Sequence, residues 1–184
     1  MLDVGVRPDS ILLVAGDVRD PKTCENLISK TVENYFNPLP QETEKLMLDA
    51  GVSSSNILLV AGDVRDPKTC ENLISKTVEK WGRLDVLVNN AGVISKLGVP
   101  VDSEENFDYT FDVNLKSIVR LNKLAIPHLE KTKGNIVNIS SINALTRGRD
   151  VPTFYALSKA ALDHYLKYEA PGLAEKGIRM NNIA

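Results

Sequence analysis

Tyr155 and Lys159 are the side chains of this sequence whose types and spacing best suit proton transfer. At this spacing on a helix they lie one turn apart and share a face. A phenol has an ordinary pKa of about 10, and an ammonium group within about 4–6 Å favours the phenolate and lowers that pKa. The pair could therefore serve as a general acid/base. The plain alternative is a surface tyrosine beside a solvated lysine.

Ser141 is a second polar side chain, placed where a substrate oxygen could bind. It follows Asn135 to Ile139, whose apolar pattern predicts a buried strand. Open α/β sheets bind ligands beyond the carboxyl ends of their strands. The Ser141 hydroxyl could there hydrogen-bond a carbonyl or alcohol oxygen, whereas a turn or helix cap is the structural alternative.

Asn114 falls on an apolar stripe of a predicted long helix. The stripe is formed at spacings of three and four by Phe107, Phe111, Ile118, Leu121 and Ala125. A buried amide without partners costs about 1–3 kcal/mol. Asn114 is therefore either a structural residue that bonds the backbone or part of a polar site inside the fold.

Strand and helix patterns alternate along most of the chain. The expected strands are 57–61, 84–88, 135–139 and 178–184. The expected helices run from an Asp66-Pro67 cap to Gly82, from an Asp102–Glu105 capping box to about Lys131 with a late interruption at Pro127, and from Thr153 to about Glu175. This alternation predicts an α/β fold, a doubly wound and mainly parallel Rossmann-like sheet with helices on both faces.

An internal duplication occupies the first part of the chain. Residues 11–33 and 57–79 are identical, at an offset of 46. We interpret residues 1–46 as a duplicated strand-helix segment and 47–184 as the core, within a single domain overall. The repeat is either a recent exon duplication or an error in gene assembly. We further expect Ile11 to Val14 to fill a place in the sheet beside Leu84 to Val88, with Ile57 to Ala61 next to it.

Composition excludes several classes of protein. The chain has 184 residues, 43% of them hydrophobic, and a formal net charge of −2, so neither nucleic acid nor an anionic membrane is an expected partner. No apolar stretch is long enough to span a bilayer. We expect a cytoplasmic protein, with Cys24 and Cys70 as buried thiols. We expect no metal site, because His128 and His164 lack ligand-spaced neighbours.

Six ordered motifs resemble the short-chain dehydrogenase/reductase family. They are Gly62-Asp63-Val64, Asn89-Asn90-Ala91-Gly92, Val113 to Ser117, Asn138 to Ser141, Tyr155 to Leu162 and Arg179 to Asn182. The resemblance extends over roughly Asp49 to Ala184. It implies an NAD(P)-dependent oxidoreductase that transfers a hydride reversibly between nicotinamide and a small carbonyl or alcohol substrate.

The resemblance also implies a role for each candidate catalytic residue. Tyr155 would exchange the proton with the substrate oxygen, and Lys159 would lower the pKa of Tyr155 and hold the nicotinamide ribose. Ser141 would orient the substrate, and Asn114 would support a water relay to Lys159.

The cofactor-binding residues implied by the resemblance form two groups. Asp63 and Val64 would meet the adenine, while Asn90, Ala91 and Gly92 would pass close to the cofactor ribose beside Tyr155 and Lys159. The resemblance further implies association of two copies through the long helices near 102–131 and 153–175.

The sequence departs from the family pattern in its phosphate-binding loop. No Gly-x-Gly occurs anywhere in the chain, although the family uses such glycines to bring backbone close to the pyrophosphate. The second strand of the family, whose end usually decides between NAD and NADP, is missing too, so both are open as the cofactor. In relatives, the segment that selects the substrate lies beyond the position of Ala184. The alternatives to an active enzyme are an inactive family fragment that acts through association and an artefact of gene assembly.

Overall fold

The computed structural model describes residues 11–16 and 40–184. The chain divides into two compact units, Met1–Trp81 and Gly82–Ala184, called unit 1 and unit 2 below. The expected boundary between residues 46 and 47 stays a prediction. In the described part of the chain no helix is both long and apolar enough to cross a membrane.

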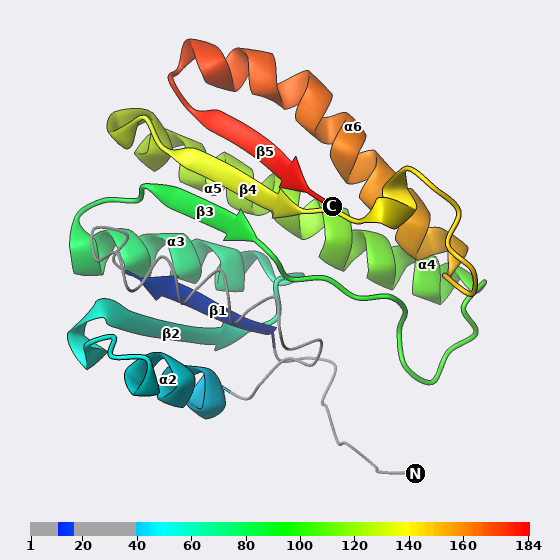
Figure 1. Cartoon of the computed structure of the whole chain (residues 1–184), viewed down its shortest axis with the longest axis horizontal. Helices are drawn as coiled ribbons and strands as arrows, with labels where there is room; N and C mark the ends of the chain where they lie inside the picture. The colour runs from blue at the N-terminus through cyan, green and yellow to red at the C-terminus, as the bar shows by residue number, and fades with distance from the viewer. Residues whose placement is uncertain (1–10, 17–39) are drawn as a thin grey trace. The chain divides into compact units, whose positions relative to one another are not determined.

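Unit 1 contains a two-stranded sheet. Its described elements are β1 (Ile11–Gly16), α2 (Pro40–Asp49), a 3-10 turn (Ser54–Asn56), β2 (Ile57–Gly62) and α3 (Pro67–Trp81). Strands β1 and β2 pair antiparallel, with Ile11 opposite Gly62 and Gly16 opposite Ile57 (Figure 1). The expected neighbour Ile57 to Ala61 is confirmed. The expected place beside Leu84 to Val88 is wrong, because that segment contributes to a separate sheet.

The ends of α3 follow its capping residues. The Lys68 backbone N–H donates to Asp66 Oδ1 at 3.0 Å, and Pro67 takes the first helical position, where its missing N–H costs no intrahelical bond. Gly82 follows the helix with a φ of 71°, which glycine adopts without strain. Cys70 is buried as expected. Cys24 and the Asp20-Pro21 cap lie outside the described residues.

Unit 2 is a parallel α/β arrangement. Its elements are β3 (Val86–Asn89), α4 (Glu104–Phe111), a π-helical turn (Asp112–Lys116), α5 (Ser117–Thr132), β4 (Asn135–Ile139), a 3-10 turn (Ile142–Ala144), α6 (Thr153–Glu175) and β5 (Arg179–Ile183). The strands lie in the order β3-β4-β5, and both pairs are parallel. The predicted alternation of strands with helices is confirmed here.

The predicted long helix differs from the structure at its start and along its length. Ser103, not Asp102, is the N-cap: its Oγ accepts from the Asn106 backbone N–H at 3.2 Å and donates to Pro100 O at 2.7 Å. A π-helical turn separates α4 from α5. Pro127 does not end α5, because a proline removes one backbone hydrogen bond while the buried residues around it, Ala125 and Leu129, still pack.

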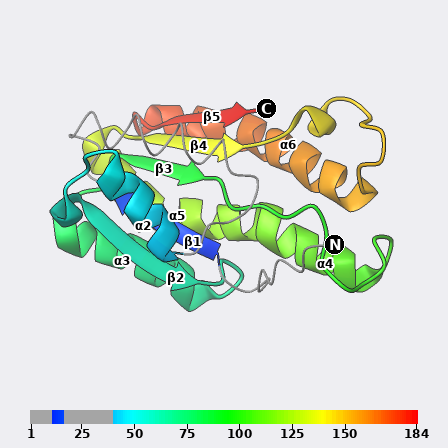
Figure 2. The same ribbon diagram turned by 60° about the horizontal axis from the view of Figure 1, so that its bottom comes forward.

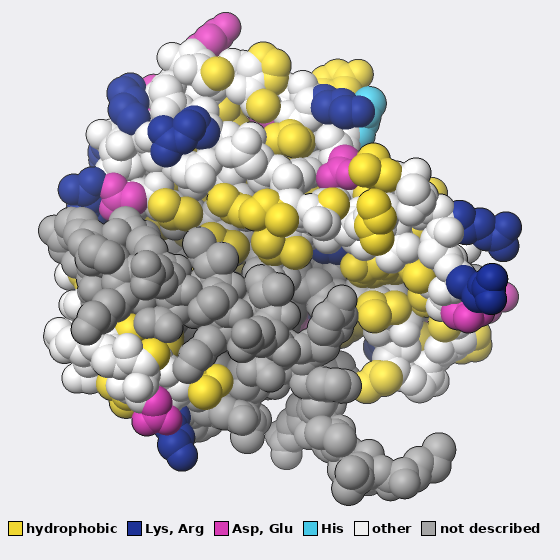
Figure 3. Space-filling view, viewed as in Figure 1, with side chains coloured by type: hydrophobic (Ala, Val, Ile, Leu, Met, Phe, Trp, Pro, Cys, Tyr) yellow, Lys and Arg dark blue, Asp and Glu magenta, His cyan; other side chains and the backbone are white. Residues whose placement is uncertain are grey.

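One face of the unit 2 sheet is buried. Leu87, Ile136 and Met180 alternate with more exposed residues along β3, β4 and β5, and none of the three is more than 7% exposed. Helices α5 and α6 contact these strands and lie on one side of them (Figure 2). Apolar side chains also show on the opposite face (Figure 3), where Val88 and Ile183 are exposed. The three strands are therefore packed against helices on their buried face.

Candidate active site

Helix α6 carries the predicted acid/base pair. Lys159 is buried, at 3% exposure, and its Nζ donates to the carbonyl oxygen of Ile139 at 2.6 Å. Ile139 is the last residue of β4, so the lysine is bound at the carboxyl end of a central strand. Tyr155 lies one turn earlier and is half-buried, with its ring centroid 5.9 Å from Lys159 Nζ. The solvated-lysine alternative is therefore wrong.

Burial changes the proton affinity of Lys159. Removal of the ammonium from water lowers the pKa of Lys159 from 10.5 to about 8, and the negative charge of Asp163 partly opposes this change. The side chain can thus take up or release a proton much closer to neutral pH than an exposed lysine can.

Asn114 joins backbone and side chains at the π-helical turn. Its side chain is fully buried. Oδ1 accepts from the Val93 N–H at 2.8 Å, while Nδ2 donates to Val93 O at 2.8 Å and to Ser158 Oγ at 2.9 Å. Ser158 Oγ in turn donates to Tyr155 O at 2.7 Å. The structural alternative is confirmed, since Asn114 bonds the backbone of Val93, and its part in a polar functional site stays a prediction.

Three segments converge on Gly92. A methyl group placed on Gly92 would lie 3.4 Å from Asn114 Oδ1 and 3.4 Å from Lys159 Nζ. The neighbouring Asn90 is exposed, and Ala91 is half-buried. The structure therefore brings the predicted Asn90-Ala91-Gly92 turn, Asn114 and Lys159 together. The absence of a side chain at Gly92 keeps space open beside the ammonium.

Ser141 caps the 3-10 turn that follows β4. Its Oγ accepts from the Asn143 backbone N–H at 3.2 Å and from Asn143 Nδ2 at 3.3 Å. The cap alternative is thus confirmed. It is compatible with a role toward substrate, because a hydroxyl that accepts two hydrogen bonds still has a proton to donate.

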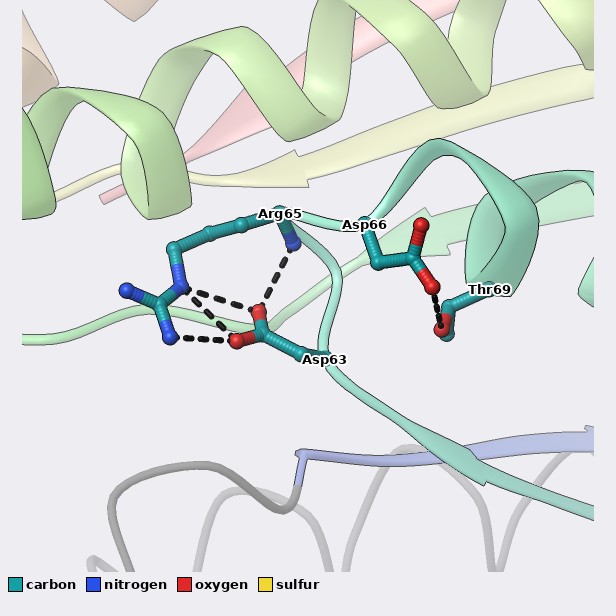
Figure 4. A network of polar contacts seen from close by, with 4 residues as sticks. All are labelled: Asp63, Arg65, Asp66 and Thr69. Carbon is teal, nitrogen blue, oxygen red and sulfur yellow. Dashed lines mark hydrogen bonds and ion pairs between the residues drawn. The ribbon is translucent and has the colours of Figure 1, made fainter.

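Asp63 and Val64 lie in unit 1, and Arg65 already binds the carboxylate there (Figure 4). The Arg65 backbone N–H donates to Asp63 Oδ1 at 2.8 Å, Nε donates to Oδ2 at 2.8 Å, and Nη2 also contacts Oδ2. Burial raises the pKa of Asp63, but the hydrogen bonds and positive charge of Arg65 outweigh it and leave that pKa below its usual value. Val64 is fully buried, and its carbonyl accepts from Cys70 Sγ.

Several partners of the site were missed by sequence reasoning. Ser158 and the backbone of Val93 are hydrogen-bonded to Asn114. Ile139 O accepts from Lys159, and Arg65 donates to the carboxylate of Asp63. Ser158 could have been found, because it lies one turn after Tyr155 and next to Lys159. The carbonyl and amide partners carry no sequence signal. No group of three or more metal-ligating side chains is found within residues 11–16 and 40–184.

Comparison with known proteins places this arrangement in a family. Residues 38–184 match the family described as Enoyl-(Acyl carrier protein) reductase. Among curated proteins, the 3-oxoacyl-[acyl-carrier-protein] reductase FabG of Thermotoga maritima is 39% identical over 106 residues, which are 57% of this chain and 43% of that protein. Oxidoreductase UcpA of Salmonella typhimurium is 43% identical over 104 residues, or 55% and 39% of the two chains. This chain spans about two fifths of the length of these relatives.

A solved structure supports the same assignment. A short-chain dehydrogenase/reductase of unknown function from Caenorhabditis elegans, solved with cofactor, is 34% identical with a TM-score of 0.72. The match covers 79% of this chain and 55% of that one. The sequence motifs, the parallel sheet and the family match agree, and the chain belongs to the short-chain dehydrogenase/reductase family.

Proposed function

We propose that unit 2 carries the proton-transfer side of an NAD(P)-dependent oxidoreductase site acting on a carbonyl or alcohol substrate. Tyr155 is the general acid/base, Lys159 its electrostatic partner, and Ser141 the residue that orients the substrate oxygen. The observation that carries this proposal is the buried Lys159 ammonium, one helical turn from Tyr155 and beside the open position at Gly92.

The residues present fit the nicotinamide side of a cofactor. An ammonium has three N–H donors, and Ile139 O takes one of them. A ribose hydroxyl could accept another, since Gly92 has no side chain to cover the ammonium on that side. Asn90 and Ala91 would flank the ribose ring. A bound nicotinamide would supply or accept the hydride at its C4 atom.

Proton movement at Tyr155 follows from its electrostatic surroundings. Tyr155 would donate its proton to a carbonyl oxygen that gains negative charge, and Lys159 would hold a positive charge beside that oxygen and the phenol. The Ser141 hydroxyl would donate to that same oxygen and hold it near the phenol. Asn114 would keep its present hydrogen bonds and support a water beside Lys159.

Turnover by matched tyrosine variants tests the proposal. We expect the full chain to oxidise NADH or NADPH in the presence of a panel of aldehydes and ketones, and Tyr155→Phe to reduce the rate at least about a hundredfold. Tyr168→Phe is the control, because Tyr168 is a largely exposed tyrosine on the same helix. Equal rates for Tyr155→Phe and wild type would contradict the role of Tyr155.

A further inference from the structure

Three asparagines form a chain of hydrogen bonds across the unit 2 sheet. Asn89, Asn138 and Asn182 are register partners on β3, β4 and β5. Asn89 Nδ2 donates to Asn138 Oδ1 at 2.8 Å, and Asn138 Nδ2 donates to Asn182 Oδ1 at 2.8 Å. Asn89 and Asn138 are buried, and Asn182 is half-buried. A connected row of amides thus crosses all three strands.

The row ends on the carboxylate of Asp163 in α6. Asn182 Nδ2 donates to Asp163 Oδ1 at 2.7 Å. Because an ionised carboxylate only accepts hydrogen bonds, Asp163 requires the NH₂ group of Asn182 and turns the oxygen of that amide toward Asn138. Asn138 must then donate to Asn182 and accept from Asn89. Leu162 O also accepts from Asn182 Nδ2, at 3.3 Å. The carboxylate and this carbonyl together set the direction of the amides in the row.

The opposite end of the row shows the cost of this orientation. Asn89 Nδ2 donates to Asn138 and also to Asn122 Oδ1 at 2.9 Å. Asn89 Oδ1 is left buried without a hydrogen-bond partner among the described residues. An unpaired buried acceptor costs about 1–3 kcal/mol. The row keeps this orientation despite the cost, because Asp163 Oδ1 and Leu162 O both accept from Asn182 Nδ2 at its other end.

Asp163 also lies one turn after Lys159 on α6, so the two side chains share a helix face. Lys159 Nζ is bound to Ile139 O, next to Asn138 in β4. Two points therefore connect this face of α6 to the sheet: the ammonium at Ile139 and the carboxylate through Asn182. The titratable groups that act on or contact the ammonium are Asp163 and Tyr155.

We propose that Asp163, oriented by Asn182, is a positioning residue for Lys159, anchoring its helix face to the sheet and holding a negative charge one turn from the buried ammonium. The inference rests on the proposed function in one respect only, which is the role of Lys159 as the electrostatic partner of Tyr155. The direction of the Asp163 effect agrees with it, since this charge opposes the burial that lowers the pKa of Lys159 to about 8.

Titration of Lys159 by NMR tests the proposal without cofactor or substrate. The full chain is labelled at the lysine side-chain carbons and nitrogens, and the Lys159 signal is assigned by its loss in Lys159→Arg. Asp163→Asn removes the charge, and we expect it to lower the pKa of Lys159 by about half a unit to one unit. Asn182→Ala keeps the charge but frees the carboxylate to turn toward water. We expect a smaller decrease in this variant.

Glu175→Gln is the matched control, because it removes an exposed carboxylate near the end of the same helix. It should leave the Lys159 titration unchanged. The proposal is overturned if Asp163→Asn and Asn182→Ala both unfold cooperatively and titrate like the control. If Asp163→Asn does not fold, Asn182→Ala decides alone. Failure of the proposed function is distinguishable from failure of this inference. In that case the wild-type chain would show no nicotinamide binding or turnover, while the pKa of Lys159 would still fall in the two variants.

Discussion

The two sheets of the molecule differ in the side chains that can fix the register of their strands. Strands β1 and β2 have the same sequence, Ile-Leu-Leu-Val-Ala-Gly, and pair antiparallel. In unit 2 the strands differ in sequence and pair parallel, with asparagines at 89, 138 and 182 in one register row. A uniform apolar strand has no side-chain group that would reject a shifted register. Buried amide side chains disfavour a shifted register, because the shift would leave each amide without its hydrogen-bond partner.

The same contrast holds for the polar contacts of the two units. The Asp63–Arg65 pair of unit 1 is a local ion pair, with side-chain exposures of 24% and 31%. The asparagine row of unit 2 is mostly buried and connects three strands and a helix. Exposed ion pairs contribute little to stability, whereas a buried polar group that loses its partner is costly. Substitutions should therefore have larger effects in unit 2.

The largest effect is expected for a cavity in the unit 2 core. Ile136 is fully buried in the central strand, so Ile136→Ala should lower the free energy of unfolding by about 2–5 kcal/mol. Ile183→Ala on β5 is the control, because its side chain is 54% exposed. Urea unfolding followed by circular dichroism measures both. Similar losses for the two variants would mean that the sheet is not packed on one face as described.

The next effect concerns pH. Because the pKa of Lys159 falls from 10.5 to about 8 on folding, the unfolded chain holds a proton that the folded chain has lost between these values. Stability should therefore rise with pH across this window. The rise from this group is at most about 3 to 4 kcal/mol, at about 1.4 kcal/mol for each pKa unit. Urea unfolding at a series of pH values should show a smaller rise in Lys159→Met, and an identical profile would contradict burial of the charge.

Breaking the asparagine row in its middle should have a moderate effect. Asn138→Ala removes the acceptor of Asn89 and the donor to Asn182, so we expect a loss of about 1–3 kcal/mol in the free energy of unfolding. Asn181→Ala, at an exposed position on β5, should change it little. The contrast between the two sheets would weaken if both substitutions were equally tolerated in urea unfolding.

The smallest effect is expected at the ion pair of unit 1. Arg65→Met should change the free energy of unfolding by less than about 1 kcal/mol. The pKa of Asp63 should rise toward or above its ordinary value, since Arg65 is what holds it down. Carboxyl NMR titration measures this shift. An unchanged Asp63 titration would show that the contact does not persist in solution.

The sequence allowed the strands and helices of unit 2 to be predicted, and β2 and α3 of unit 1, but not α2. The strand at Asn135 to Ile139 and the helix at Thr153 to Glu175 agree with the structure residue by residue. The helix start at Ser103 was misplaced by one residue, since Asp102 is also a good cap. The pairing of β1 with β2 was expected, but its antiparallel direction was not, because an apolar run specifies a strand and not its direction.

The sequence identified the residues of the candidate site but not the contacts that they make. Spacing placed Tyr155 and Lys159 on one face, and the apolar stripe placed Asn114 inside the fold. The partners of these residues, such as Ile139 O and the Val93 backbone, depend on tertiary structure. The row through Asn89, Asn138 and Asn182 becomes visible only once the strand register is known.

Cofactor binding tests the central claim most directly. A thermal-shift titration of the full chain with NADH and NADPH, on wild type and Lys159→Met, measures binding to the folded state, because such a ligand must raise the melting temperature. We predict a concentration-dependent rise with at least one of the two nicotinamides, and a smaller rise in Lys159→Met. No rise with either ligand, in a chain that melts cooperatively, would contradict a functional nicotinamide site in this protein.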